Sequence, residues 1–313
     1  MLVGVDIGAS RTKLVVLPPG AQQPVHQRVV ETPVEASPQE FLAWLVRELQ
    51  ALHVEHFAGV GIGIAGLVNR RGELLLAPNL PRLRNFALQQ GLQERLRCPI
   101  LLDNDANVAA WAEALYGAAH DVESFLYVTL GTGVGGAIVL ERRLWRGVDG
   151  TAGEIGHMVV DITATGITGL PPYRIGVLEE YTGMSALLRC AASVVRRYPH
   201  SELFAQPVTL DALARAYHAG DEAAQECLVW YGWVLGIGIA SALALLGLQV
   251  VVLGGGIVEV FPQLPELVAR VVHERALPPL VPTVQVRRAQ FGSWAGALGA
   301  AWLVAEYVGS APA

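Results

Sequence analysis

The sequence predicts an α/β fold made of two similar halves. Apolar strands alternate with amphipathic helices along the chain, a pattern typical of layered α/β domains. One unit, an apolar strand followed by a glycine turn and a second apolar strand, occurs at residues 2–17 and again at residues 125–140. Because 52% of the 313 residues are hydrophobic, the chain can also bury a large core. The repeated unit indicates an internal duplication around a cleft.

The first half shows its elements in regular order. Short apolar runs that end at glycine or at polar residues indicate strands. Helical spacing of Phe41, Leu45 and Leu49, after the start signal Ser37-Pro38, predicts the first helix. The expected elements are strands at residues 2–7, 12–17, 60–64 and 100–102, and helices at residues 37–52, 86–96 and 108–116.

The second half begins with strands at residues 125–130 and 137–140, and the chain ends with a helix at residues 295–307. Residues 228–258 carry no charge, a length that would span a bilayer. Gly247 interrupts this segment, and a β-branched run follows it. We therefore expect a buried helix followed by a buried strand, and no membrane association.

Charge and cysteine content exclude several classes of protein. A net charge of −6 argues against a nucleic-acid partner. Three cysteines without a C-x-x-C pair fit a reducing compartment, so we expect a cytoplasmic protein. An acid at Asp6 comes too early for a signal peptide.

Three glycine turns follow predicted strands. Gly131, Gly133 and Gly136 match the dinucleotide pattern G-x-G-x-x-G. An NAD-dependent dehydrogenase would need a helix and then a strand next, but residues 147–157 are too rich in glycine for a central strand. Together with the turns at residues 6–10 and 254–256, the pattern favours binding of nucleotide phosphates by backbone N–H groups.

A polar run, Asp103-Asn104-Asp105-Ala106-Asn107, follows the strand at residues 100–102. Such a run can be the N-cap of a helix. It can also place a carboxylate where it accepts a proton from an alcohol, with an asparagine beside it to hold other hydroxyls. The residues alone leave both interpretations open.

With these motifs in order, the chain resembles the ROK family (repressor, open reading frame, kinase) of glucokinase-like sugar kinases, in the actin/hexokinase ATPase superfamily. The resemblance covers nearly the whole chain. It rests on Asp6-Ile7-Gly8, Gly63-Ile64-Ala65-Gly66, Ala77-Pro78-Asn79-Leu80, Leu102 to Asn107, Gly131 to Gly136, Gly153-Glu154-Ile155-Gly156-His157, Leu253 to Gly256 and Ala295 to Ala300.

The resemblance implies a role for each matching position. Asp105 matches the catalytic base that deprotonates the primary hydroxyl of the sugar. Positions that match sugar-binding residues are Asn104, Glu154, His157, Glu179 and Gly66, with Glu180 beside Glu179 as an alternative. Positions that match the nucleotide motifs are Asp6, Gly8 and Ser10, then Gly131, Thr132 and Gly133, then Gly254, Gly255 and Gly256. Phosphoryl transfer of this kind depends on positioning and on Mg²⁺.

One departure concerns the structural zinc of the family, which a histidine and three cysteines hold. Counting back from Glu179 places Leu170, Pro172 and Val177 at the cysteine positions. His157 alone cannot form a closed four-ligand site, so we expect no zinc.

The resemblance implies two ribonuclease H-like (actin-like ATPase) domains around a cleft. We expect the first at residues 1–117 plus 295–313 and the second at residues 118–294. The implied activity is ATP- and Mg²⁺-dependent phosphorylation of a hexose, glucose first, at its 6-hydroxyl, by a homodimer. The resemblance does not decide whether the phosphoryl donor is ATP or polyphosphate. It also does not decide whether the sugar is glucose, mannose, fructose or an N-acetylated hexosamine.

Two other classes also stay open. A catalytically retired sugar-binding protein would keep the fold without turnover. A ROK-type repressor would need a DNA-binding module before the core, and Met1 lies only five residues before Asp6, so we expect none.

Overall fold

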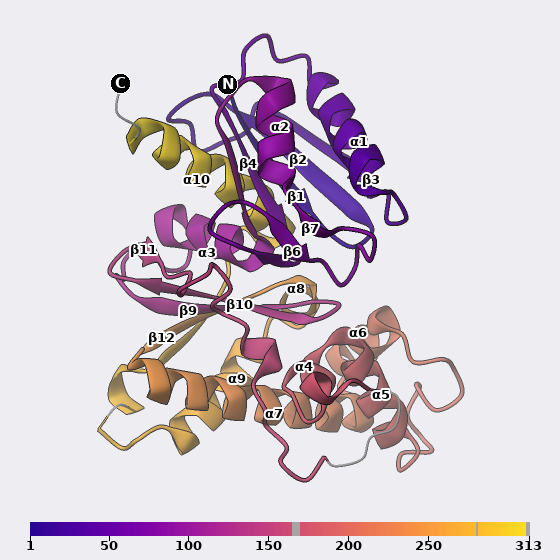
Figure 1. Ribbon diagram of the computed structural model, residues 1–313. Coiled ribbons are helices and arrows are strands. Elements are labelled where there is room, and N and C mark those ends of the chain that lie inside the picture. Colours follow the sequence, from indigo (N-terminus) through magenta and orange to yellow (C-terminus); the bar gives the residue numbers. More distant parts are fainter. Residues whose placement is uncertain (165–169, 280, 311–313) are drawn as a thin grey trace. The chain divides into compact units, whose positions relative to one another are not determined.

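The computed structural model describes residues 1–164, 170–279 and 281–310 (Figure 1). Two compact units divide the chain: residues 1–123, 137–153 and 293–313 form the first, and residues 124–136 and 154–292 the second. Residues 118–123, 137–153 and 293–294, which we expected in the second domain, therefore belong to the first unit. Residues 165–169, 280 and 311–313 of the expected domains lie outside the described part of the chain.

The first unit is built on a five-stranded sheet with the order β3-β2-β1-β4-β8. Strands β1, β2 and β3 pair antiparallel, whereas β1, β4 and β8 run parallel. The strands are β1 (Leu2–Ile7), β2 (Arg11–Leu17), β3 (His26–Glu31), β4 (Gly59–Ile64) and β8 (Ile100–Asn104). The predicted hairpin of the first half is thus confirmed as β1 and β2.

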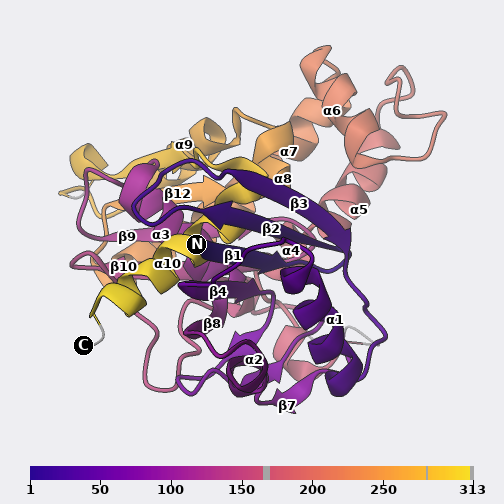
Figure 2. The ribbon, with the colours of Figure 1, turned by 90° about the horizontal axis from the view of Figure 1, so that it is seen from above.

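Four helices belong to this unit: α1 (Pro38–Gln50), α2 (Leu88–Leu96), α3 (Asp105–Tyr116) and α10 (Ala295–Ser310). Helices α1 and α2 lie on one face of the sheet and α10 on the other (Figures 1 and 2). Ser37 caps α1 through a capping box with Glu40, as the start signal predicts. Buried side chains of α1 and α2 form one core with alternate residues of the strands.

The sequence of β4, Gly-Val-Gly-Ile-Gly-Ile, explains how α10 packs. Its valine and isoleucines are buried in the core with α1 and α2, while its glycines face the opposite side. A Cβ atom at Gly61 would lie 1.9 Å from the carbonyl oxygen of Ala300 in α10, and one at Gly4 of β1 would lie 1.9 Å from that of Ala297. Helix α10 therefore rests directly on the backbone of β1 and β4.

Smaller elements complete the first unit. A three-stranded antiparallel sheet has the order β5-β6-β7. Its strands are β5 (Leu67–Val68), β6 (Leu74–Leu76) and β7 (Arg84–Phe86). The end of β10 (Val134–Leu140) pairs with β11 (Arg143–Leu144) through a turn in which Glu141 and Arg142 both have positive φ.

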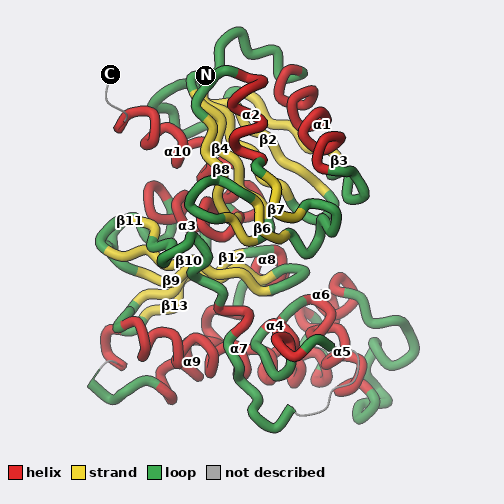
Figure 3. The backbone as a smooth tube through the Cα atoms, viewed as in Figure 1, coloured by secondary structure: helices red, strands yellow, loops and turns green. Residues whose placement is uncertain are grey.

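The second unit has a parallel arrangement at its centre. The second five-stranded sheet has the order β11-β10-β9-β12-β13, and β10 passes from one unit into the other. Strand β12 (Val250–Gly254) runs parallel to both β9 (Phe125–Leu130) and β13 (Gln285–Arg288). Figure 3 shows these strands in yellow.

Four helices of the second unit pack against α7 (Glu222–Leu246). They are α4 (Glu179–Thr182), α5 (Met184–Val195), α6 (Leu210–His218) and α9 (Leu264–Arg275). Helix α8 (Gly256–Val260) packs against β12 and β9. Short 3₁₀ turns lie at Ile155–His157, Pro172–Arg174, Val281–Thr283 and Gly292–Trp294, the last in the first unit.

Helix α7 is, among the described helices, the single one long and apolar enough to cross a membrane. Its most apolar stretch is 61% buried within the protein, against α5, α6 and α9. Gly247 ends it in the left-handed conformation and β12 follows, so the prediction of a buried helix and a buried strand is confirmed.

Two predicted helices differ from the structure at their starts. The helix expected at residues 86–96 begins at Leu88, because Arg84–Phe86 pairs with β6 as an edge strand. The helix expected at residues 108–116 begins at Asp105, because Asn104 caps it. The second difference places Asp105 in the first turn of a helix.

We expect Gly61→Ala to lower the free energy of unfolding by about 3 kcal/mol, because the new methyl group forces α10 away from the sheet. Gly309→Ala in the same helix is the control, since a Cβ there meets nothing within 4 Å. Urea unfolding of both variants measures the difference. Equal stability of the two variants would contradict the packing described here.

Candidate functional site

Two carboxyl groups lie close together in the first unit. Asp6 is near the end of β1, and Asp105 is the first residue of α3. Burial raises the pKa of Asp6 from 3.8 to about 7, with a further contribution from the charge of Asp105, while Lys13 acts in the opposite direction. Burial also raises the pKa of Asp105, against hydrogen bonds that lower it, including one from the backbone N–H of Ala106. Either carboxyl group thus retains a proton more readily than an exposed one.

The start of helix α10 packs against Asp6 of this acid pair. A Cβ at Gly296, in its first turn, would lie 2.6 Å from Cγ of Asp6. Only glycine leaves room for the carboxyl group at this point, and the positive end of the helix dipole faces it. Lys13 donates a hydrogen bond to the carbonyl oxygen of Ser293, just before the helix. Asp6 is therefore enclosed by β1, Lys13 and the start of α10.

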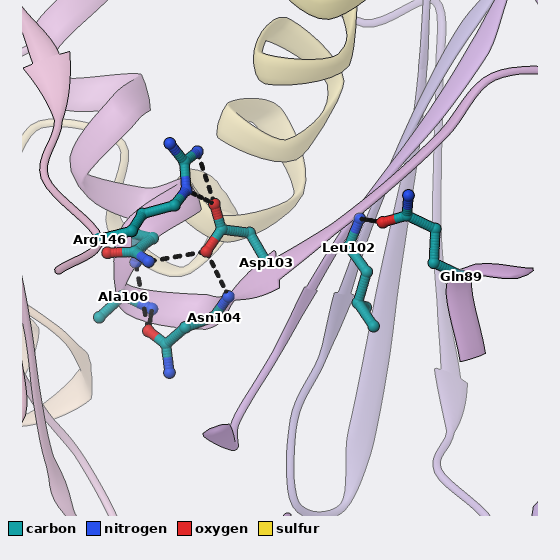
Figure 4. Close-up of polar contacts among 7 residues, drawn as sticks. Gln89, Leu102, Asp103, Asn104, Ala106 and Arg146 are labelled. Carbon is teal, nitrogen blue, oxygen red and sulfur yellow. Dashed lines mark hydrogen bonds and ion pairs between the residues drawn. The ribbon is translucent and has the colours of Figure 1, made fainter. Parts of the chain in front are cut away.

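Asp103 organises the start of α3 (Figure 4). Its Oδ1 accepts hydrogen bonds from the backbone N–H of Asn104 (2.8 Å) and from Nδ2 of Asn107 (2.7 Å). Its Oδ2 accepts two from Arg146, at 2.8 Å from Nε and 2.7 Å from Nη2. Two charge-assisted hydrogen bonds to one carboxylate oxygen hold the Arg146 guanidinium group against Asp103. The sequence interpretation missed the roles of Asp103 and Arg146, which lie 43 positions apart.

Asn104 performs the capping role that the sequence left open. Its Oδ1 accepts from the backbone N–H groups of Ala106 (2.8 Å) and Asn107 (3.3 Å). Its Nδ2 donates to the carbonyl oxygen of Gly66 (3.1 Å), so the structure brings two predicted sugar-binding positions together. The side chain of Asn104 thus holds Asp105 at a fixed place in the first turn.

The turn between β1 and β2 contains Gly8 and Ser10. A Cβ at Gly8 would lie 2.9 Å from the carbonyl oxygen of Arg11, and the two residues are joined by a backbone hydrogen bond of 3.1 Å. Thr32 donates from its hydroxyl to the carbonyl oxygen of Gly8 (3.0 Å), while the Ser10 side chain is exposed. The turn is tight and anchored.

The corresponding turn of the second unit is held by Glu179. A Cβ at Gly133 would lie 2.2 Å from Oε2 of Glu179, and the same oxygen accepts a hydrogen bond from the backbone N–H of Val134 (2.9 Å). Thr132 is exposed, and Gly131 has open space where a side chain would project. The glycine turn, predicted to bind nucleotide, and Glu179, predicted to bind sugar, therefore lie next to each other within this unit.

Arg174 holds Glu179 in turn. Its Nη2 lies 3.0 Å from Oε1 of Glu179 and 2.5 Å from Oε1 of Glu180. The sequence did not indicate this residue, although it lies in the loop that resembles the zinc loop. Within the described residues, no group of three or more histidine, cysteine, aspartate or glutamate side chains could hold a metal ion. At the former cysteine positions, Pro172 begins a 3₁₀ turn and Val177 is buried.

Glu154 precedes a 3₁₀ turn of the second unit, and His157 is the last residue of that turn. Nδ1 of His157 lies 3.4 Å from Oε2 of Glu154, and its ring stacks on Tyr173 with centroids 6.4 Å apart. Both side chains are exposed. A Cβ at Gly156 would lie 2.2 Å from the carbonyl oxygen of Val134, so the turn packs against the start of β10.

The third glycine motif ends β12 beside a pocket of about 410 Å³. A Cβ at Gly254 would meet the hydroxyl of Tyr127 at 2.4 Å, and Gly255 has a φ of 90° and packs on Leu130. Gly256 has open space. The first two glycines are thus required by packing, whereas the third leaves its backbone accessible. The pocket is lined by Leu253 to Gly255, Val258, Glu259, Arg288 to Gln290 and Gly292.

Comparison with known proteins gives consistent matches along the chain. The sequence profile of the ROK family matches residues 2–307. The glucokinase of Halalkalibacterium halodurans is 32% identical over 256 residues, which cover 79% of this chain and 76% of that protein. The xylose repressor of Bacillus spizizenii is 27% identical over 249 residues, which cover 80% of this chain and 61% of the repressor.

Solved structures match over almost the full length. A ROK hexokinase from Thermus thermophilus is 31% identical, with a TM-score of 0.74, over 98% of this chain and 99% of that chain. A ROK family glucokinase from Streptomyces griseus, in complex with glucose and AMPPNP, is 28% identical with a TM-score of 0.81, over 96% of this chain and 98% of that chain. These matches confirm the predicted two-domain actin-like ATPase fold.

We expect Asp6→Asn to raise the free energy of unfolding at pH 8 by about 2–4 kcal/mol, because it removes a buried charge that folding disfavours. Below pH 4 the carboxyl group is neutral in both the folded and the unfolded chain, so the gain disappears there. Between pH 4 and 7 the gain grows with pH. Urea unfolding across this range measures it, with the exposed Asp211→Asn as control. A gain independent of pH would show that Asp6 has an ordinary pKa.

Proposed function

This chain belongs to the ROK family, and we propose that it is a sugar kinase that transfers the γ-phosphoryl group of ATP to the 6-hydroxyl of a hexose, with glucose as the first candidate. Support comes from glucokinase and hexokinase relatives that match most of the chain. The observation that carries the proposal is the acid pair formed by Asp6, near the end of β1, and Asp105, at the start of α3.

Asp105 is the proposed general base. A raised pKa makes its carboxylate a better proton acceptor than an exposed aspartate, and a general base works best when its pKa approaches the working pH. Asn104 and Asp103 fix its position from two sides through the hydrogen bonds of the helix cap. Its expected partner is the sugar hydroxyl, which loses its proton as the new P–O bond forms.

The acid pair also fits a magnesium ion. Carboxylate oxygens are protein ligands that suit Mg²⁺, and a cation beside Asp6 and Asp105 would offset the burial and the charge repulsion that raise the pKa of Asp6. ATP and Mg²⁺, when bound, would supply the phosphoryl donor and neutralise its charge. The protein would orient the sugar hydroxyl and the phosphoryl donor.

Backbone groups are the proposed nucleotide ligands. Gly256 has open space where a side chain would project, so phosphate oxygens can approach its N–H group. Gly131 has the same open space, but its N–H donates to the carbonyl oxygen of Gly133 at 3.0 Å, so a phosphate there would have to replace that hydrogen bond. The pocket of about 410 Å³ beside Gly254 and Gly255 is the proposed adenosine site. On the sugar side, the proposal keeps Glu154, His157 and Glu179 as ligands of hydroxyl groups.

We expect Asp105→Asn to lower kcat by about 10²–10⁴-fold while sugar binding is retained, because the amide cannot accept the proton. A coupled assay with Mg-ATP over a panel of glucose, mannose, fructose and N-acetylated hexosamines measures turnover, and polyphosphate replaces ATP in a parallel series. Asp211→Asn on the exposed side of α6 is the matched control.

Near-normal turnover of Asp105→Asn would show that Asp105 is not the general base. Sugar binding in calorimetry, with no turnover of the parent protein on any sugar, would favour the retired binding protein.

We expect Arg174→Gln to raise KM for the sugar by about tenfold and to change kcat less, because Glu179 loses a charged partner at 3.0 Å. Arg174→Lys should recover part of the affinity, and Arg215→Gln, on an exposed face of α6, should leave KM unchanged. Steady-state kinetics of the three variants measure this. An unchanged KM in Arg174→Gln would show that Arg174 does not position a sugar ligand.

A further inference from the structure

A pocket in the first unit is separate from every residue assigned above to sugar or nucleotide. It has a volume of about 720 Å³ and lies wholly within the first unit, beside the edge strand β8. Its walls come from β8, α2, α3, α10, the loop at residues 68–72 and the hairpin at residues 143–150. None of the predicted site residues lines it.

Its wall carries more positive than negative side chains. Arg70, Arg143 and Arg146 line it, against the carboxyl groups of Asp103 and Glu306. This excess is notable in a chain whose net charge is −6. Asp103 already forms an ion pair with Arg146.

Arg143 is the arginine available to a ligand. Arg70 donates to the carbonyl oxygen of Gly147, and Arg146 uses Nε and Nη2 on Asp103. The side chain of Arg143 is exposed and, among the described residues, makes no hydrogen bond or ion pair, while its backbone pairs with Leu140. Arg146 keeps its second terminal nitrogen, Nη1, outside the pair with Asp103. Two guanidinium groups of this kind match the oxygens of a phosphate group.

The remaining wall suits a ring with polar substituents. Trp111 and Trp145 line the pocket, and Trp145 is 46% exposed although it is a large aromatic residue. The amide side chains of Asn69 and Gln89 lie on the same wall. Aromatic faces with a few polar groups are typical of small-molecule sites.

We propose that this pocket is a second ligand site, which binds a phosphate monoester of a ring-bearing small molecule, the hexose phosphates being the class that fits. The phosphate group binds Arg143 and Nη1 of Arg146, and the ring lies against Trp145. The assignment of the pocket depends on its own residues and not on the proposed activity.

The site is coupled to the start of α3, and this second step rests on the proposed function. Arg146 binds Asp103, which in turn holds Asn104 and Asn107 around Asp105. A phosphate that binds Nη1 of Arg146 draws the same guanidinium group away from Asp103, which holds Nε and Nη2. Occupation of the pocket therefore loosens the helix cap and lowers kcat without competing with the sugar.

The test for binding is calorimetry of the full chain, saturated with glucose and AMPPNP so that the proposed active site is filled. Glucose 6-phosphate is the probe, and we expect one further equivalent to bind. Arg143→Gln should weaken this binding at least tenfold, because a charge-assisted contact is lost. Arg71→Gln is the matched control, since Arg71 lies in the neighbouring loop but does not line the pocket.

Several outcomes would overturn the proposal. They are the absence of this extra binding, equal affinity in Arg143→Gln, and equal affinity for free glucose at the same site. Equal affinity for inorganic phosphate would overturn the ring contact. In a kinetic series, glucose 6-phosphate should lower kcat of the parent protein without competing with the sugar, and this effect should be weaker in Arg143→Gln. Unchanged turnover would overturn the coupling alone. Failure of the kinase proposal leaves the calorimetric result intact.

Discussion

The direct contact of α10 with the backbone of β1 and β4 is the constraint on which the first unit depends. Glycine at alternate positions of β4 removes the side chains that would separate helix and sheet. Helix α3 uses the same device, because a Cβ at Gly299 of α10 would lie 1.7 Å from the carbonyl oxygen of Val108. Since β1 carries Asp6 and α3 carries Asp105, this close packing is what brings the two carboxyl groups together.

Burying two acids beside each other is unfavourable, and the structure compensates only in part. Lys13 lowers the pKa of Asp6, and hydrogen bonds from the helix backbone lower that of Asp105, yet burial dominates at both positions. The adjacent Asp103 differs from both, because it forms an ion pair with Arg146. One acid is therefore locked into an ion pair, while the two next to the proposed chemistry are left ready to bind a proton or a cation. Perturbed carboxyl groups of this kind are typical of functional sites.

Much of this organisation is visible in the sequence. The strand and helix pattern, the two hairpins and the position of Asp105 at a strand-to-helix junction follow from local signals. The alternation of glycine with valine and isoleucine at residues 59–64 could also have indicated close helix packing, since it leaves one face of a strand without side chains. The partners Arg146 and Arg174 could not be predicted, because nothing in their neighbourhood identifies which acid a surface arginine will meet. The place of residues 137–153 in the first unit could not be predicted either. They are bonded to the loop around Arg70, which is distant in sequence.

In the loop around Arg174, which has no cysteines at the positions of the zinc ligands, a network of side chains positions Glu179. Arg174 ties Glu179 to Glu180, and Tyr181 donates to Asp161 at 2.5 Å, so the ends of the loop are joined by charged hydrogen bonds. The isolated bridge between Val159 and Val177 adds a backbone connection. Partly exposed ion pairs are individually weak, and salt screens them, whereas metal coordination is strong and coupled to folding. The position of the Glu179 side chain is therefore set by several weak contacts together. One of them, the hydrogen bond from the backbone N–H of Val134, joins it to the glycine turn.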